Sequence, residues 1–316
     1  MRFLRFLPIY KERVWGGDDF DRHLGRAVPA HSNPYGESWE ISDRDDAQSV
    51  VAGGAFAGAT LRSLIAQETG WLMGRGWPPA ARFPLLVKWL SCRERLSLQV
   101  HPPEELAREL GGDAKNELWY IAAAEPHAAL IAGFKRGATR EKFAALLERN
   151  DLEPILHRFP VAAGDALYTP SGRVHAIDAG CFILEVQQNS DTTYRVYDWG
   201  RPRELHVEQS LRCANFNDHE PAPLRHSEGE LLITDSAGFR TRAFALAAGD
   251  ALPPHAAETP AVVGVVAGEL AERADGSVLR AGDNVILPAA ERFDFVATRP
   301  TRVLLTDEFA AAAGAV

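Results

Sequence analysis

The sequence predicts a mainly β protein, a sandwich or barrel repeated in two modules, with a small helical part. Short runs rich in Val, Leu, Ile and aromatic residues recur at close intervals from residue 84 onward, with turn residues between them. The order Gly-Asp, short strand, Pro occurs at 164–170 and again at 282–288, which suggests two related β modules. Helical spacing of apolar residues is confined to a few segments.

Length and composition are those of an ordinary globular protein of about two domains. The chain has 316 residues, 46% hydrophobic and 24% charged, with a formal net charge of -9. This acidic balance argues against a nucleic-acid-binding or membrane-surface protein, because those partners need a positive field. A small anionic ligand remains compatible, since a local Arg/Lys cluster outweighs the net charge at short range. We expect a monomer or a homodimer.

The cysteines and the N-terminus favour a cytoplasmic protein. Three widely spaced cysteines, an odd number without a C-x-x-C motif, make a disulfide framework or a thiolate metal site a poor fit. No apolar run approaches the roughly 20 residues of a membrane helix. Basic residues interrupt the apolar start of the chain, which we interpret as a first strand rather than a signal peptide.

The elements divide into a larger and a smaller unit. A helix is predicted over 60–71 with Thr60 as N-cap, another over 139–149, and a short one over 206–214. Strands are predicted at PLLVKWL, RLSLQVH, NELWYIA, ALYTP, RVHAI, CFILEVQ and TYRVYDW of the larger unit, and at five further runs after residue 229. The predicted boundaries are 1–217 for a larger domain with helical insertions, 218–228 for a polar, proline-containing linker, and 229–316 for a C-terminal β domain.

Three strands carry residues that could bind a metal. Alternation along 95–101 places Gln99 and His101 on the polar face. Glu117 shares a face with aromatic and apolar residues, where a carboxylate is costly unless it is paired or bound to a metal. His175 begins the strand after the turn at 170–172. Singly, His101 is more often a structural histidine, and Glu117 is equally well explained by an ion pair with an arginine.

Together these residues offer one amide oxygen, one carboxylate and two imidazoles, which favours a metal site over separate structural roles. Zn²⁺ accepts such nitrogen and oxygen ligands, and without thiolates the set also suits Mn²⁺ or Fe²⁺. The spacing G-x5-P-x-G-x2-H, ending at His175, is a strand–turn–strand pattern of cupin barrels. Polar residues also alternate inward downstream, with Thr193, Arg195 and Tyr197 predicted on one face.

The motifs WGG, GESWEIS, FPLLVKWL, LSLQVHP, KNELWYI, PSGRVHAI and EVQQNSDTTYRVYDWGR together resemble those of type I mannose-6-phosphate isomerases, in the short bacterial form. The resemblance covers roughly residues 10–215. It implies two cupin-type (jelly-roll) β-barrels with a small helical part, one zinc ion, and interconversion of mannose 6-phosphate and fructose 6-phosphate.

The resemblance also implies roles for individual residues. The zinc ligands would be His101, Glu117 and His175, with Gln99 as the fourth. Arg195 lies in the arginine position of the DTTYR motif, to which catalysis is assigned. Glu185 would lie near the proton-transfer machinery, and Lys115 matches a lysine two positions before the glutamate ligand. Asn116 and Arg173 depart from the residues common in the family, which bears on substrate breadth.

The chemistry of an aldose–ketose isomerase then suggests further candidates. A cis-enediol intermediate needs a base, for which Glu185 is the first candidate, and a fixed cation such as Arg195. The phosphate also needs cations, and the candidates are Lys88, Lys115, Arg173 and Arg201. Lys88 could instead pair with a carboxylate, and Arg201 could be surface charge. A non-catalytic sugar-binding cupin and another metal-dependent cupin enzyme, such as an oxygenase or epimerase, are the alternatives.

Overall fold

Antiparallel β-sheets form most of the molecule, which is described by a computed structural model over residues 2–30, 32–256 and 258–309. A seven-stranded sheet has the order β15 (Leu224–Arg225), β11 (Asp165–Thr169), β8 (Glu117–Ala124), β13 (Cys181–Gln188), β6 (Leu85–Cys92), β3 (Tyr35–Ile41) and β2 (Ile9–Gly17). A five-stranded sheet has the order β10 (Leu156–Pro160), β9 (Ala129–Phe134), β12 (His175–Ile177), β7 (Leu98–Val100) and β14 (Tyr194–Tyr197).

These two sheets face each other and form the first barrel. Side chains that point inward from the seven-stranded sheet, such as Trp119 and Ile183, pack against Leu130 and Ile177 of the five-stranded sheet. Alternate residues of the same strands point outward, because side chains alternate across a pleated sheet. The functional side chains described below share this interior with the apolar core.

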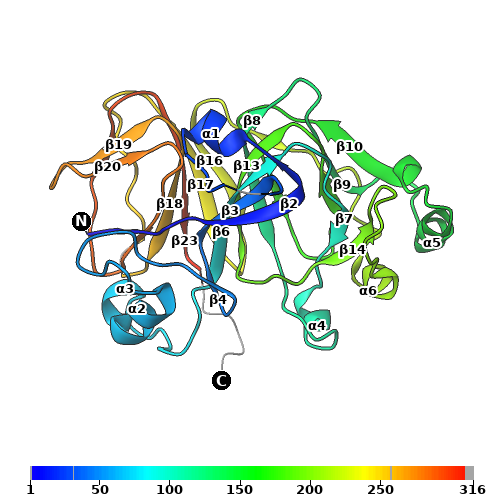
Figure 1. The fold of residues 1–316 in the computed structure, drawn as a ribbon, viewed down its shortest axis with the longest axis horizontal. Helices are drawn as coiled ribbons and strands as arrows, with labels where there is room; N and C mark the ends of the chain where they lie inside the picture. Colours follow the sequence, from blue (N-terminus) through cyan, green and yellow to red (C-terminus); the bar gives the residue numbers. More distant parts are fainter. Residues whose placement is uncertain (1, 31, 257, 310–316) are drawn as a thin grey trace.

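A second barrel lies beside the first, on the left in Figure 1. Its larger sheet has the order β1 (Leu4–Arg5), β21 (Asn284–Leu287), β18 (Ala261–Ala267), β23 (Thr301–Asp307), β17 (Arg240–Leu246) and β16 (Gly229–Asp235). Its smaller sheet has the order β20 (Val278–Arg280), β19 (Glu269–Glu272) and β22 (Phe295–Ala297). The prediction of a mainly β protein with two cupin-type barrels is confirmed.

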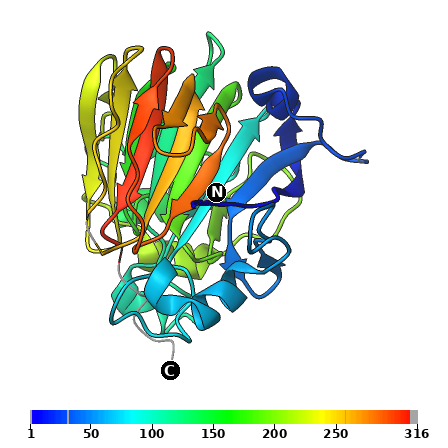
Figure 2. The ribbon, with the colours of Figure 1, turned by 90° about the vertical axis from the view of Figure 1, so that its left-hand side faces the viewer.

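The two barrels pack back to back through a large apolar layer. Leu184 and Val186, on the outer face of β13, belong to the same buried cluster as Val262 and Leu304 of the second barrel. The strands of both barrels run side by side in Figure 2. Strand β13 therefore contributes apolar residues to the inter-barrel layer and, at alternate positions, polar residues to the first barrel's interior.

One strand of the first predicted unit joins the second barrel, and a strand within the predicted linker joins the first barrel. Strand β1, from the N-terminus, pairs with β21 of the second barrel, with Leu4 opposite Ile286. The predicted linker contains β15, which extends the seven-stranded sheet by pairing with β11. We propose to keep 1–217 and 229–316 as the two units, with β1 assigned to the second barrel and β15 to the first.

The helices cover the outside of the sheets. They are α1 (Asp19–Leu24), α2 (Leu61–Gln67), α3 (Thr69–Leu72), α4 (Glu104–Ala107), α5 (Arg140–Glu148) and α6 (Val207–Cys213), with a 3-10 turn at Glu153–Ile155 and a small hairpin of β4 (Asp43–Arg44) and β5 (Ala47–Gln48). Thr60 caps α2 as predicted, because its side chain accepts a hydrogen bond from the Ser63 amide. The predicted helix over 60–71 is divided in two at Glu68, which ends α2 and precedes α3.

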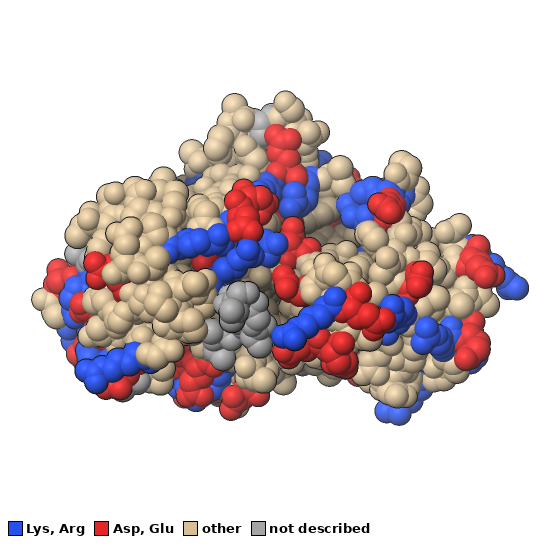
Figure 3. Space-filling view, turned by 90° about the horizontal axis from the view of Figure 1, so that it is seen from below, with Lys and Arg blue, Asp and Glu red and all other residues tan. Residues whose placement is uncertain are grey.

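The surface mixes charges of both signs. On the face shown in Figure 3, acidic and basic side chains are interspersed. Within the described residues, no helix has the length and apolar character needed to cross a bilayer.

Candidate metal centre and active site

Three neighbouring strands align a polar row inside the first barrel. Gln99, at the middle of β7, lies opposite His175 of β12 on one side and opposite Arg195 of β14 on the other. Residues directly opposite each other in a sheet project from the same face. The register therefore points these three side chains into the barrel, and His101 follows just beyond the end of β7.

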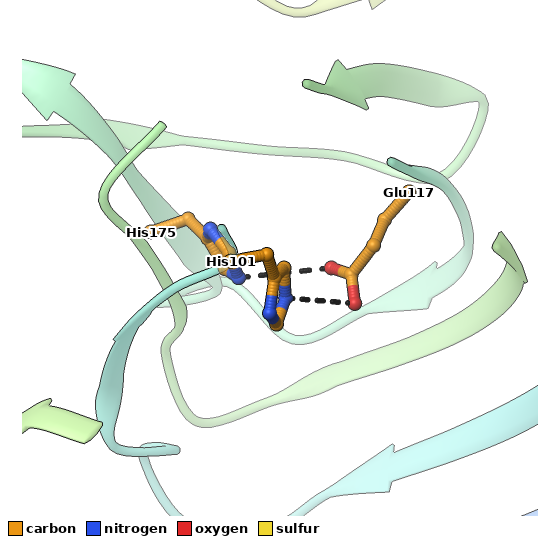
Figure 4. Close-up of side chains that lie close together, drawn as sticks. All are labelled: His101, Glu117 and His175. Atoms are coloured by element: carbon orange, nitrogen blue, oxygen red, sulfur yellow. Dashed lines mark ion pairs between the residues drawn. The ribbon is translucent and has the colours of Figure 1, made fainter. Parts of the chain in front are cut away.

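His101, Glu117 and His175 converge within the barrel, as Figure 4 shows. One potential ligand atom from each lies within 4.8 Å of the others. The Nε2 atom of His101 is 3.1 Å from Glu117 Oε1, and the Nε2 atom of His175 is 3.6 Å from Glu117 Oε2. All three residues are buried, so bulk water does not solvate these atoms.

Backbone carbonyls fix the tautomer of both imidazoles. Nδ1 of His101 lies 2.9 Å from the Thr192 carbonyl oxygen, and Nδ1 of His175 lies 2.8 Å from that of Arg173. A carbonyl oxygen only accepts, so each Nδ1 donates its proton and, in the neutral ring, each Nε2 presents a lone pair. Neither Nε2 has a hydrogen-bond partner among the described residues.

The protonation states follow from burial and neighbouring charge. Burial, together with the nearby His101, lowers the pKa of His175 to about 3, against the opposing effect of Glu117. Burial and the Lys115 ammonium also lower the pKa of His101. Burial alone would raise the pKa of Glu117, but Lys115 and His101 outweigh it and hold this pKa well below its ordinary value. At neutral pH both rings are neutral and the carboxylate is ionised.

This donor set fits a divalent cation. Two imidazole lone pairs and a carboxylate face one another across a few ångströms with no proton between them, an arrangement that a cation stabilises. The Nδ1–H to carbonyl hydrogen bonds are the contacts that orient metal-binding histidines in proteins. Gln99 donates from Nε2 to Ser97 Oγ at 3.0 Å, which leaves its amide oxygen as a further potential ligand.

Two buried lysine–glutamate pairs lie next to this centre. Lys115 Nζ is 2.8 Å from Glu117 Oε1, and Lys88 Nζ is 2.8 Å from Glu185 Oε2. The other oxygen of Glu185 accepts a hydrogen bond from Trp119 Nε1 at 2.8 Å. Burial raises the pKa of Glu185, opposed by Lys88, whereas Glu185 and Glu37 raise the pKa of Lys88 against the effect of its burial. Glu185 therefore combines burial with an ordered ion pair.

A third acidic group follows on the next strand of the same sheet. Glu37 of β3 accepts hydrogen bonds from Arg13 Nε at 2.8 Å and from Trp39 Nε1 at 2.6 Å. Burial alone would raise its pKa, but Lys88 and Arg13 outweigh burial and lower the pKa of Glu37 to about 2. Charged side chains thus extend across five neighbouring strands of the sheet, from Glu117 of β8 to Arg13 of β2.

These groups line one cavity of about 430 Å³. The predicted site residues that line it are Gln99, Glu117, His175, Glu185, Lys88, Lys115 and Arg195, while His101 lies buried against Glu117. Sequence reasoning missed Arg13, Glu37, Asp191 and Arg203, which also line the cavity. Of these, Glu37 lies in the GESWEIS motif and Asp191 in the QQNSDTTYR segment, so the motifs themselves could have indicated them.

Two predicted phosphate ligands are not brought to this cavity. Arg173 pairs with Asp218 at 2.7 Å and also donates to the Tyr168 carbonyl oxygen. Arg201 pairs with Asp198 at 2.8 Å and donates to the Arg95 carbonyl oxygen. Neither arginine is among the described lining residues. Their guanidinium groups are held by carboxylates outside the cavity, and their role as substrate ligands stays a prediction.

A β-bulge corrects the predicted face of one strand. Arg195 of β14 lies opposite Gln99, but Tyr197 lies opposite Leu98, so the register shifts by one residue between them. Tyr197 consequently points to the outer face of the sheet, where its hydroxyl donates to the Asn150 carbonyl oxygen at 2.7 Å. Arg195 and Thr193 line the cavity, and Tyr197 does not.

The fold and this centre define a cupin-type protein with a buried site of two histidines and one glutamate. Residues 3–139 match the family model for the phosphomannose isomerase type I catalytic domain. The chain is 38% identical over 240 residues to mannose-6-phosphate isomerase ManA of Bacillus subtilis (strain 168), covering 73% of this chain and 74% of ManA. It is 39% identical over 207 residues to mannose-6-phosphate isomerase of Streptococcus mutans, covering 63% and 64%.

Solved structures agree with these sequence matches. The crystal structure of mannose 6-phosphate isomerase from Bacillus subtilis is similar with a TM-score of 0.81 and 29% identity, covering 97% of this chain and 99% of that one. A structure described as zinc-bound mannose 6-phosphate isomerase shares the fold, with a TM-score of 0.78 at 17% identity, covering 98% and 100%. The chain belongs to the type I phosphomannose isomerase family.

Proposed function

We propose that this protein is a metal-dependent isomerase that interconverts mannose 6-phosphate and fructose 6-phosphate. The observation that carries the proposal is the convergence of two unprotonated imidazole nitrogens on a buried carboxylate, inside a polar cavity of a chain of this family. His101, Glu117 and His175 would hold Zn²⁺, with Gln99 as a fourth ligand. When bound, zinc would act as a Lewis acid that polarises the sugar carbonyl and stabilises negative charge on oxygen.

The chain's own residues would move the proton and hold the substrate. Glu185 is the base that carries a proton between C1 and C2 through a cis-enediol, because its buried position raises its pKa toward the working range of a general base. Lys88 and Trp119 fix both of its oxygens. Arg195, whose guanidinium stays charged, would orient the substrate rather than act as a base.

The charge of the cavity supports a phosphorylated substrate. Among the described lining residues, five are cationic and four are acidic. A bound divalent cation would make the site clearly positive, which favours a sugar phosphate dianion over an uncharged sugar. Of the proposed phosphate ligands, Lys88 and Lys115 remain in the cavity, where each also pairs with a carboxylate.

We also propose a cytoplasmic enzyme that acts as a monomer or a homodimer. The three cysteines are free and buried, which fits a reducing compartment. The proposed metal ligands, base and cations all belong to one chain, as a monomeric enzyme requires.

A coupled assay for fructose 6-phosphate, combined with metal analysis, tests the proposal. We expect turnover of mannose 6-phosphate that is lost on chelation and restored by Zn²⁺. His101→Ala should lose at least about 100-fold in kcat/KM, while His127→Ala, at an exposed position, should retain the wild-type value. Wild-type turnover by fully demetallated protein would contradict the proposal. Binding without turnover would favour a sugar-binding cupin, and substrate-dependent O₂ uptake would favour an oxygenase.

A further inference from the structure

A tight reversal after β14 brings two arginines back onto one buried carboxylate. The backbone of Trp199 and Gly200 is left-handed, with φ of 54° and 85°, and the Arg201 amide donates to the Asp198 carbonyl oxygen at 3.0 Å. A left-handed conformation is unfavourable for a bulky side chain. Contacts hold Trp199 there, since its Nε1 donates to the Leu96 carbonyl oxygen at 2.6 Å and Arg95 stacks over its ring.

The Asp198 carboxylate is almost fully shielded and binds both arginines. It accepts hydrogen bonds from Arg203 Nε at 2.6 Å and Nη2 at 2.7 Å, and from Arg201 Nε at 3.0 Å. Asp198 is 2% exposed. Burial alone would raise its pKa, but Arg203 and Arg201 outweigh burial and lower it, so the carboxylate is ionised. Two-pronged contacts of this kind fix the plane of a guanidinium group.

The two arginines differ in what they face. Arg203 lines the cavity beside Arg195, whereas Arg201 is turned away and donates to the Arg95 carbonyl oxygen. Arg195 is held from the same hairpin, because its Nη1 donates to the Glu204 carbonyl oxygen at 2.7 Å. Arg195 Nε has no hydrogen-bond partner among the described residues, and the contacts of Arg203 to Asp198 use its Nε and Nη2, not its Nη1. Donors therefore remain for an anion between these two side chains.

Three guanidinium groups gather at this rim near the carboxylates of Asp198 and Glu204. Arg195, Arg201 and Arg203 are close enough that burial and the other two guanidinium groups lower the pKa of Arg195, against Asp198 and Glu204. Elsewhere in the cavity, Lys88, Lys115 and Arg13 are each paired with a carboxylate. A bound anion would therefore interact most favourably with the arginines of this hairpin.

We propose that Asp198 is a positioning residue that holds Arg203 beside Arg195, so that the two arginines receive the phosphate group of the substrate. This inference rests on the proposed function for the identity of the phosphate ester. The strand register sets the distance between the proposed phosphate site and the metal ligands. Arg195 lies two strands from His175, about 10 Å at the usual strand spacing. That span suits a six-carbon sugar whose reacting end lies at the histidines. The phosphate then anchors the substrate at a distance from the reacting carbons.

The test compares Asp198→Asn with Asp307→Asn in the zinc-loaded protein. Asp307 is a matched control, because it is fully buried in the second barrel and pairs with Arg240 and Arg242, also two residues apart. We expect Asp198→Asn to raise KM for mannose 6-phosphate at least tenfold with kcat within threefold, and to weaken binding of inorganic phosphate in calorimetry by a similar factor. Asp307→Asn should leave both quantities at the wild-type value.

Two further variants separate positioning from a general structural effect. Arg203→Ala should reproduce the KM increase, while Arg201→Ala should have a smaller effect, because Arg201 faces away from the cavity. If Asp198→Asn yields no folded protein, Arg203→Ala carries the same test. An unchanged KM in Asp198→Asn or Arg203→Ala, or an equal loss in Asp307→Asn, would overturn the inference. Absent isomerisation by the wild type would instead refute the proposed function, and phosphate calorimetry would still report on the arginines.

Discussion

The pair formed by Lys88 and Glu185 gives a quantitative test of how the site is stabilised. Their charged atoms are 2.8 Å apart and both side chains are buried. At an effective dielectric constant of about 20 the gross attraction is about 6 kcal/mol, most of which offsets the cost of burying the two charges. Replacing Lys88 by Met keeps the length of the apolar stem and leaves Glu185 buried without its partner.

The loss of stability in Lys88→Met has an upper bound set by protonation of Glu185. An unfolded glutamate titrates near pH 4.3, so keeping Glu185 protonated in the fold at pH 7 costs about 4 kcal/mol. We therefore expect a destabilisation of at most about 4 kcal/mol at pH 7. Because losing Lys88 raises the folded-state pKa of Glu185 beyond its already raised wild-type value, the deficit should grow with pH by up to about 1.4 kcal/mol per unit once the wild-type carboxyl ionises, and shrink at lower pH.

Urea unfolding of four proteins measures this effect: wild type, Lys88→Met, Glu185→Gln and the double variant. The glutamine retains an acceptor for Trp119 Nε1, so the double variant removes both charges and keeps that hydrogen bond. We expect the double variant to be less destabilised than the sum of the single variants by about 2 kcal/mol or more, while all three lose isomerase activity. Additive losses, or a Lys88→Met deficit that does not change with pH, would refute this account.

Three other outcomes follow from contacts described above. Glu37, with its pKa lowered to about 2, should contribute about 3 kcal/mol to the free energy of unfolding at pH 7, and this contribution should disappear between pH 4.5 and 2. The stability deficit of Glu37→Gln, measured by urea unfolding, should therefore vanish in acid. A deficit that stays constant with pH would contradict this. Thr60→Ala should cost about 1 kcal/mol in urea unfolding without changing kcat, and a loss of activity would show that α2 acts on the site. Arg195→Ala should lower kcat/KM at least about 100-fold at unchanged zinc content, and a near-wild-type value would remove it from the mechanism.

The convergence of His101, Glu117 and His175 could be predicted from the sequence because strand alternation carries the information. Gln99 and His101 are two residues apart on one face of a strand, and Glu117 is a carboxylate among apolar neighbours, so the pattern itself indicates inward-facing ligands. What alternation cannot supply is a local register shift. The bulge after Arg195 turns Tyr197 outward, although strict alternation predicts the opposite.

The positions of the basic side chains are harder to predict, because a sequence does not show which carboxylate each one pairs with. Arg201 and Arg203 are two residues apart and share Asp198, yet only Arg203 reaches the cavity. Which arginine reaches the cavity depends on the chain reversal at Trp199, and a tryptophan in the sequence does not indicate a left-handed backbone. Likewise, the short strand β1 was predicted only as a first strand, since its partner lies 282 positions further along the chain in the pairing of Leu4 with Ile286.

That pairing ties the two barrels together, because β1 lies in the sheet of the second barrel while the chain after it continues into the first. Residues made first during synthesis must wait for nearly the whole polypeptide before β1 can find its place, so the second barrel is completed late and through a contact of very long sequence separation. A fragment starting at residue 229 would leave the edge of β21 open, with unpaired backbone groups available for association. Transplanting the C-terminal barrel into another protein would therefore require bringing the first few residues along with it.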